Sequence, residues 1–292
     1  MEKTLQKENL KIAIQKNGRL SEDSLKVLEH MGLELETYGR RLFATCRNFP
    51  VEVLFCRDDD IPGYVESGVA DLGIVGQNIV RETGSKLVEL SKPGFGYCRL
   101  TAAVPKKSEI TQLSELEGKS IATSFPRLTK ELFETRGVNI KVIEIAGAVE
   151  ITPALGVADA ILDITSTGST MMLNDLKPIE VLMETEAVIV AGSTKLTSAK
   201  QRLVDQMLTR LSGVLAAKNL KYVLMNAPSK SLESIKKVAP GLNAPTVMPL
   251  ARDGWIAIHA VIDEAQFWEV FPELKALGAE GILVMPIEKV IP

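Results

Sequence analysis

The chain has 292 residues, 46% of them hydrophobic and 24% charged, which is enough apolar sequence for two or three globular domains. A net charge of −3 without a basic block argues against duplex nucleic acid as a partner, and no apolar run reaches membrane-spanning length. Two histidines are too few for a zinc site or a histidine relay. The polar N-terminal segment and three cysteines without metal or redox spacing predict a cytoplasmic protein with reduced thiols.

Short strands and helices alternate over the first two thirds of the chain, a pattern typical of α/β architecture. Strands are predicted at 11–14, 51–55, 71–75, 99–104, 113–116, 119–123, 141–145, 158–164 and 186–191. Helices are predicted at 21–31, 61–67, 127–136, within 147–156 and at 199–219, and two more begin at 77 and 171. We expect two α/β lobes joined by crossing segments near residues 95 and 188, with a cleft between them.

The last third of the chain has a different order of elements. Strands are predicted at 221–226, 246–250, 255–261 and 281–287, and helices at 231–238 and 264–277. This β-α-β-β-α-β order is ferredoxin-like and predicts a separate small domain. The predicted divisions are a discontinuous first lobe at 1–96 and 187–220, a second lobe at 97–186, and a C-terminal domain at 221–292.

A run of hydroxyl residues follows the apolar segment that ends at Ile164. Thr165, Ser166, Thr167, Gly168, Ser169 and Thr170 come between this predicted strand and a predicted helix. Backbone N–H groups at a helix N-terminus bind phosphate, hydroxyls add donors, and glycine permits close approach. Asp163 at the strand end is placed to hold ribose hydroxyls. An ordinary strand-turn-helix junction with a hydroxyl cap remains the alternative, and the spacing is neither a P-loop nor a Rossmann turn.

Cations follow two strands of the first lobe. Lys16 and Arg19 flank an Asn-Gly turn, where they suit a polyphosphate or simply face solvent. Arg57 offers a planar guanidinium for bidentate phosphate contacts. The three aspartates at 58–60 suit Mg²⁺ together with substrate phosphates, or the N-terminus of the next helix, and we favour capping for Asp60.

Three further positions are compatible with a site without requiring one. Gly73, in the sequence DLGIVG, permits backbone approach to a ligand, but a tight strand-helix turn also needs glycine. Arg41 lies in a predicted surface turn of a hairpin. Arg99 stands at the entry to the second lobe, where it could anchor one lobe to the other.

The run from 150 to 171 resembles the signature of the ATP phosphoribosyltransferases, the first enzymes of histidine biosynthesis. The positions that match are Glu150, Gly156, Ala158, Ile161, Asp163, Ile164, Thr167, Gly168, Thr170 and Met171. The KNGRL segment that begins at Lys16 also resembles the family's start. ATSFP, at 122–126, resembles its ATSYP with Phe125 in place of tyrosine, so no role of that hydroxyl carries over.

The resemblance implies a fold, a reaction and a set of roles. The fold would be a two-lobed core of the periplasmic-binding-protein type II kind, with a C-terminal ferredoxin-like, ACT-like regulatory domain. The reaction would join N1 of ATP to C1 of phosphoribosyl pyrophosphate with Mg²⁺ and release pyrophosphate. The implied catalytic residues are Lys16, Arg57 and Asp163. The implied substrate contacts are Arg19, Arg41, Gly73, Glu150, Asp163, Thr165, Ser166, Thr167, Gly168, Ser169 and Thr170.

The resemblance covers nearly the full chain and therefore implies the long form of the enzyme. In this form the C-terminal domain binds histidine as feedback inhibitor, and the matching positions are Asn226, Thr246, Val261 and Gly281. Asn226 and Thr246 are polar positions in otherwise apolar strands, which edge-strand exposure would also explain. The family further implies a homohexamer assembled from dimers.

Two other functions compete with this prediction. A two-lobed solute-binding or ligand-sensing module has the same architecture, but it would release no pyrophosphate from the two substrates. The short form of the enzyme needs a separate regulatory partner, and the C-terminal domain predicted here argues against it.

Overall fold

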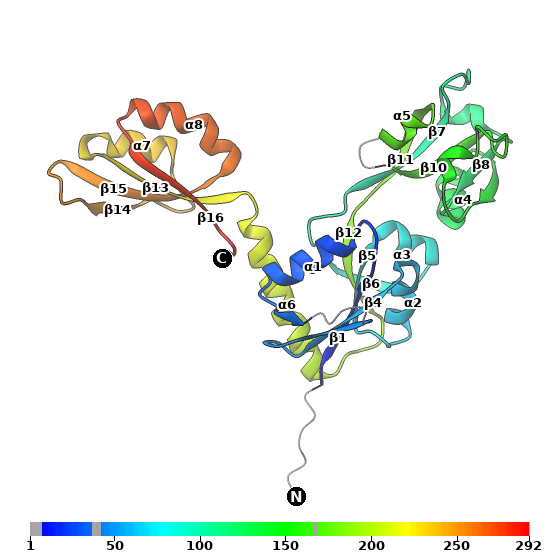
Figure 1. Cartoon of the computed structure of the whole chain (residues 1–292), viewed down its shortest axis with the longest axis horizontal. Helices are drawn as coiled ribbons and strands as arrows, with labels where there is room; N and C mark the ends of the chain where they lie inside the picture. Colours follow the sequence, from blue (N-terminus) through cyan, green and yellow to red (C-terminus); the bar gives the residue numbers. More distant parts are fainter. Residues whose placement is uncertain (1–7, 37–41, 166–168, 292) are drawn as a thin grey trace, which may run out of the picture. The chain divides into compact units, whose positions relative to one another are not determined.

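A computed structural model describes residues 8–36, 42–165 and 169–291, without the side chains of Ser169 and Thr170 (Figure 1). The chain divides into two compact units, Met1–Asp205 and Gln206–Pro292, which are described separately. Among the described helices, none is both long enough and apolar enough to span a membrane.

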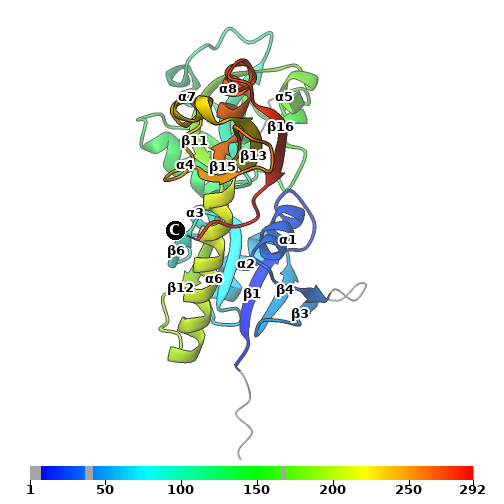
Figure 2. The same ribbon diagram turned by 90° about the vertical axis from the view of Figure 1, so that its left-hand side faces the viewer.

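The first lobe of the first unit is built on a seven-stranded sheet with the order β2-β3-β4-β1-β5-β12-β6. Its strands are β1 (Leu10–Gln15), β2 (Leu35–Glu36), β3 (Phe43–Cys46), β4 (Val51–Cys56), β5 (Leu72–Gly76), β6 (Leu87–Ser91) and β12 (Ala187–Gly192). Figure 2 shows β1, β4 and β3 side by side. β1 pairs in parallel with β4 and β5. Its residues are almost all buried, as expected for a parallel strand covered on both faces.

The connections of this lobe are short helices that follow the strands. They are α1 (Ser21–His30), the 3₁₀ turn η1 (Asp58–Asp60), α2 (Ile61–Glu66) and α3 (Gln77–Thr83). Because β1 and β4 run in parallel, the loops after their carboxyl ends lie at the same edge of the sheet.

The second lobe is built on a five-stranded sheet with the order β11-β7-β10-β8-β9. Its strands are β7 (Cys98–Pro105), β8 (Ser120–Thr123), β9 (Lys141–Glu144), β10 (Ala160–Thr165) and β11 (Leu176–Thr185). The other elements are η2 (Leu113–Leu116), α4 (Pro126–Glu134), η3 (Val149–Ile151) and α5 (Ser169–Leu173). The chain enters this lobe before β7 and leaves it between β11 and β12. The predicted two-lobed α/β architecture is confirmed.

Several local predictions were wrong. Residues 113–116 form a 3₁₀ turn and not a strand, because Gln112 and Glu115 make a reciprocal capping box around it. The helix predicted within 147–156 is only the short turn η3. β11 was missed, as were the short strands β2, β3 and β6. β11 is an edge strand without regular alternation of buried and exposed residues, and its register shifts at Pro178 and again at Val181.

The second unit contains a four-stranded antiparallel sheet with the order β14-β15-β13-β16. Its elements are β13 (Leu220–Pro228), η4 (Ser229–Ser231), α7 (Leu232–Val238), β14 (Thr246–Pro249), β15 (Trp255–Asp263), α8 (Glu264–Ala276) and β16 (Glu280–Pro286). Helix α6 (Ser198–Ala217) begins in the first unit and ends in this one. Val223, Ile258 and Phe267 belong to the core between the sheet and its helices. The predicted ferredoxin-like order is confirmed.

Candidate active site

Strand β10 carries signature residues near its carboxyl end, at one end of the second lobe's sheet. It lies between β7 and β8, and Ile161 and Leu162 on it are fully buried. The strand ends at Thr165, and α5 begins at Ser169. A strand before the hydroxyl run and a helix at its end therefore follow in the predicted order. Ser166, Thr167 and Gly168 lie outside the described residues.

Asp163 is the partly buried acid of this strand end. Its Oδ1 accepts a hydrogen bond of 2.7 Å from the backbone N–H of Ile164. Burial raises the pKa of Asp163 to about 6, the Ile164 bond opposes that rise, and the charge of Glu150 adds to it. The charge of Glu150, the other carboxylate of the signature, therefore acts on Asp163. A partly buried carboxyl that titrates near neutral pH is typical of a functional site.

Thr165 links the strand end to β7. Its hydroxyl lies 2.8 Å from that of Thr101 and donates to the carbonyl of Arg99 at 3.3 Å. Thr165 is also the register partner of Arg99. Arg99 is therefore beside the start of the hydroxyl run, and its Nε lies 3.3 Å from Glu184.

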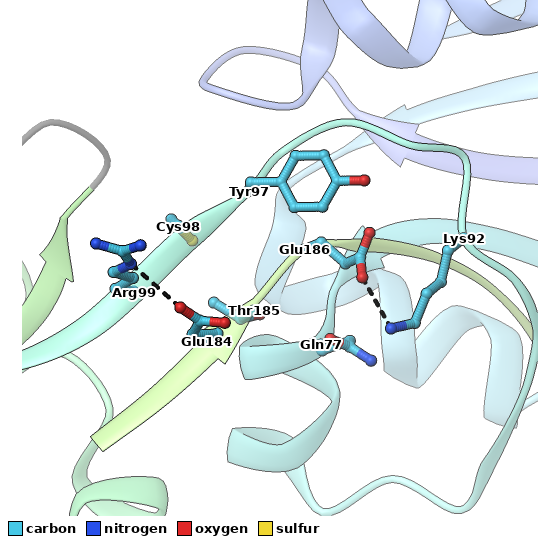
Figure 3. A pocket seen from close by; sticks show the side chains of 8 residues that line it. All are labelled: Gln77, Lys92, Tyr97, Cys98, Arg99, Glu184, Thr185 and Glu186. Carbon is cyan, nitrogen blue, oxygen red and sulfur yellow. Dashed lines mark hydrogen bonds and ion pairs between the residues drawn. The ribbon is translucent and has the colours of Figure 1, made fainter. Parts of the chain in front are cut away.

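A pocket of about 500 Å³ lies where the chain crosses between the lobes (Figure 3). We call it the crossing pocket; its lining residues are Gln77, Lys92, Tyr97, Cys98, Arg99, Glu184, Thr185 and Glu186. Arg99 joins it to the end of β10. Figure 3 shows Tyr97 on the same side as Glu186 and Lys92, and Arg99 paired with Glu184 on the other.

Charged side chains of the crossing pocket form ion pairs with one another. Lys92 Nζ lies 2.8 Å from Glu186, and this bond raises the pKa of Lys92. Burial, together with Glu186, raises the pKa of Tyr97, although the residue is 61% exposed. Apart from Arg99, sequence reasoning missed these residues. The predicted crossings near 95 and 188 were the available signal, since the pocket lies between them.

A second pocket, of about 440 Å³, lies at the carboxyl ends of β1 and β4. Its lining residues are Lys16, Asn17, Leu42, Phe55, Cys56, Arg57, Asp58, Asp60 and Tyr64. Lys16 donates its backbone N–H to Cys56 at 2.8 Å, which places Lys16 next to Arg57 at the sheet edge. The structure thus brings two of the three predicted catalytic residues together in what we call the cationic pocket.

Arg19 takes a different direction from Lys16. Its Nη1 donates to the carbonyl of Gly96 at 2.6 Å, just before Tyr97. Its charge opposes the rise that burial gives to the pKa of Cys98. The loop between β1 and α1 therefore supplies one cation to the cationic pocket and one to the rim of the crossing pocket.

The aspartates after Arg57 form the turn η1. Asp60 occupies the N-cap position of α2, the position that we favoured for it, and its side chain makes no capping hydrogen bond there, so its negative charge acts through the helix dipole. Burial, with the charges of Asp60 and Asp58, raises the pKa of Cys56 to about 11, which keeps this thiol protonated. Over the described ranges, no group of three or more His, Cys, Asp or Glu side chains could hold a metal ion by itself.

One predicted substrate contact has a different explanation in the structure, and another lies outside the described residues. Gly73 is buried in β5, and a Cβ there would lie 2.6 Å from Ile61 Cγ2. Close packing of β5 on α2 explains this glycine, so its prediction as a substrate contact has no support in the structure. Arg41 falls outside the described residues.

The predicted effector positions lie on one sheet of the second unit. Val223 and Met225 on β13, and Ile258 and Ala260 on β15, point into the core. Alternation therefore places Asn226 and Val261 on the opposite face. Thr246 is exposed on edge strand β14 opposite His259. Gly281 has a φ of +60°, and a Cβ there would lie 3.3 Å from Asn226 Nδ2.

Comparison with known proteins decides the family. The model of "ATP phosphoribosyltransferase" matches residues 57–213, and that of "HisG, C-terminal domain" matches 217–289. ATP phosphoribosyltransferase from Bacteroides fragilis is 49% identical over 97% of this chain and 99% of its own. That of Cytophaga hutchinsonii is 45% identical over 97% and 98%.

The chain belongs to the ATP phosphoribosyltransferase family. The predicted activity, phosphoribosyl transfer in histidine biosynthesis, is confirmed. The solved ATP phosphoribosyl transferase (HisG:HisZ) complex from Thermotoga maritima contains a chain similar to this one, with 27% identity and a TM-score of 0.59. It covers 69% of this chain and 98% of its own. The present chain has in addition a stretch that matches the C-terminal family model, as predicted for the long form.

Proposed function

We propose that the enzyme joins ATP to phosphoribosyl pyrophosphate in its first unit, giving N1-(5-phosphoribosyl)-ATP and pyrophosphate. The bond from adenine N1 to ribose C1 forms as the bond from C1 to the pyrophosphate oxygen breaks. The N1 lone pair needs no activated side chain, so catalysis rests on alignment of two anions and on stabilisation of the leaving group. The observation that carries this proposal is the contact of Thr165 with Arg99, which joins the predicted phosphate cradle to the crossing pocket.

The cradle would take the 5-phosphate and Asp163 the ribose. The run 165–170, which reaches into the start of α5, would supply backbone N–H and hydroxyl donors. Asp163, with its pKa of about 6, would be ionised when it accepts bonds from the ribose hydroxyls. Glu150 would tune this ionisation through its charge, and need not touch the sugar itself.

The cationic pocket would take the pyrophosphate. Arg57 is 81% exposed and its Nη2 is 3.7 Å from Asp59, a weak pairing that leaves the guanidinium able to reach a ligand. Lys16 adds a second cation from the same pocket. Mg²⁺ usually binds through one or two carboxylates and substrate phosphates. Asp58 and Asp60 line this pocket and would supply those carboxylates. The ion would neutralise charge on the leaving pyrophosphate.

The crossing pocket would take ATP. Its volume is in the range of small-molecule sites, and it combines an exposed aromatic ring with amide, hydroxyl and charged groups. The Tyr97 ring offers a face for the adenine. Arg99 and Arg19 lie at its edge, toward the cradle and the β1 loop, where they would meet the triphosphate.

The second unit would bind histidine and inhibit the enzyme at a distance. Asn226, Thr246, Val261 and Gly281 would form that site on the sheet described above. We propose the domain divisions given from the sequence, a cytoplasmic location, and a homohexamer of dimers in which Arg41 reaches a neighbouring active site. The Thermotoga maritima relative, solved as a complex, supports assembly as a property of similar chains.

The test is pyrophosphate release from ATP, phosphoribosyl pyrophosphate and Mg²⁺, with and without histidine. We expect release that needs both substrates and falls when histidine is added. A protein that binds both compounds and releases no pyrophosphate would be a binding module, and the proposal would fail. Release that histidine leaves unchanged would refute only the regulatory part.

A further inference from the structure

Helix α4 of the second lobe is capped by a carboxylate from the first lobe. Phe125, at its N-cap position, provides no side-chain bond. Instead Glu82, on α3, accepts the N–H of Arg127 at 3.0 Å and that of Leu128 at 2.8 Å. Pro126 has no N–H, and Thr129 donates back to the carbonyl of Phe125. Glu82 therefore satisfies the free donors of the helix's first turn.

This cap occupies a place where α/β folds often bind anions. α4 follows β8, which lies parallel to β10, so its N-terminus is at the carboxyl end of the strands. A negative group is stabilised there by the peptide dipoles. In this chain the anion is the protein's own Glu82.

Two further contacts join the same pair of helices. Arg81 pairs with Glu131 on α4, and its Nη1 lies 3.2 Å from the sulfur of Met183 on β11. The guanidinium of Arg127 lies over Gly84, where a Cβ would be 1.4 Å from Nη1. Any side chain at Gly84 would displace that arginine.

The other end of α3 touches the second lobe as well. Asn78 donates its N–H to the hydroxyl of Thr185 at 3.1 Å, and both residues are buried. Gln77, one residue earlier, lines the crossing pocket. One short helix therefore connects the crossing pocket with the Glu82 contact, and it is held to the second lobe at both ends.

We propose that α3 is a pivot between the lobes, and that Glu82 is a positioning residue that sets the width of the crossing pocket. Glu82 touches no substrate; it acts by holding α4 against α3. Only the expected effect on the kinetics depends on the proposed assignment of ATP to the crossing pocket.

The direct test is the distance between the lobes in the full-length protein. Nitroxide labels on Lys26→Cys of α1 and Lys130→Cys of α4 would be used with Cys46 and Cys56 replaced by serine. Pulsed dipolar spectroscopy should give one narrow distance distribution, and Glu82→Ala should at least double its width. Glu134→Gln is the matched control: it removes a carboxylate from α4 whose ion pair, with Lys130, lies within the helix and is already absent from the labelled protein. An unchanged width in Glu82→Ala overturns the pivot.

Amide exchange and kinetics distinguish a pivot from a simple cap. Glu82→Ala should lower the protection of the Arg127 and Leu128 amides at least tenfold, whereas Glu134→Gln should not. The KM for ATP should rise at least fivefold with kcat within twofold. Lost protection with an unchanged KM would mean that Glu82 only caps α4. If the parent releases no pyrophosphate, the proposed function has failed, while the distance measurement still decides whether the pivot exists.

Discussion

The two candidate substrate sites at strand ends of the first unit differ in the charge and in the burial of their side chains. In the first lobe, the parallel strands β1 and β4 bring exposed cations together at the sheet edge, with Lys16 and Arg57 in one pocket. In the second lobe, β10 places a partly buried carboxyl, Asp163, ahead of a hydroxyl run. Exposed cations cost the fold little, whereas a buried carboxylate destabilises it unless a ligand or proton compensates. We therefore expect mutations at the two sites to affect activity and stability in different proportions.

The largest effect should come from Asp163→Asn, which keeps the side chain's shape and removes its charge. We expect kcat/KM to fall at least 100-fold, about 2.7 kcal/mol of transition-state stabilisation, because the ribose hydroxyls lose an ionised acceptor. Glu150→Gln is the control that changes a neighbouring charge, and it should cost less. An Asp163→Asn enzyme within threefold of the parent would contradict the role of this carboxylate.

Asp163→Asn should lower activity, but it should raise the stability of the folded state at pH values where Asp163 is ionised. The folded-state pKa of Asp163 is raised to about 6 from 3.8, so the folded state binds a proton more readily than the unfolded chain. Folding stability should therefore fall by about 2 kcal/mol as the pH rises from 4 to 6, and stay low above that. Urea unfolding should show this decline in the difference between the stability of the parent and that of Asp163→Asn, because the other titrating groups are common to both. A difference that does not fall across that window would refute the partly buried, ionising carboxyl.

Arg57→Ala tests the cationic pocket, where a substitution should affect activity more than stability. We expect kcat/KM to fall roughly tenfold, about 1.4 kcal/mol, through loss of pyrophosphate contacts. The thermal midpoint should change by no more than about 2 °C, because the side chain is exposed and its ion pair weak. Enzyme assays and calorimetry on one preparation would measure both. Activity within twofold of the parent with a sharply lowered midpoint would make Arg57 structural.

The parts of this contrast were not equally visible in the sequence. β10 was predictable because a strand in the middle of a sheet is covered on both faces and therefore has a continuous apolar sequence. Asp163 and the hydroxyl residues that follow are conspicuous beside that apolar run. β11 was not predictable, because it is an edge strand that contains Pro178 and whose register shifts twice, so buried and exposed residues do not alternate along it. Arg19 and Lys16 come from one loop, and only the fold shows that they serve different pockets. The crossing pocket depends on the register of Thr165 with Arg99, which no local pattern encodes.

The smallest effect should be in the second unit. Thr246 is exposed on β14, so Thr246→Val should leave uninhibited turnover nearly intact. If Thr246 helps to hold histidine, the concentration needed for half inhibition should rise about fivefold, near 1 kcal/mol for one lost hydrogen bond. Inhibition curves at several ATP concentrations would provide the measurement. Unchanged inhibition, or direct competition with ATP, would place the effector elsewhere.

The most direct test of the division between the two strand-end sites uses the two halves of phosphoribosyl pyrophosphate as separate probes. Titration calorimetry would measure the Kd of ribose 5-phosphate, and of magnesium pyrophosphate, for the parent, Arg57→Ala and Thr167→Val/Thr170→Val. The double variant should weaken ribose 5-phosphate at least tenfold and leave pyrophosphate within twofold, and Arg57→Ala should do the reverse. If both variants weaken both probes equally, or if neither weakens either, the assignment of phosphate to the cradle and pyrophosphate to the cationic pocket is wrong.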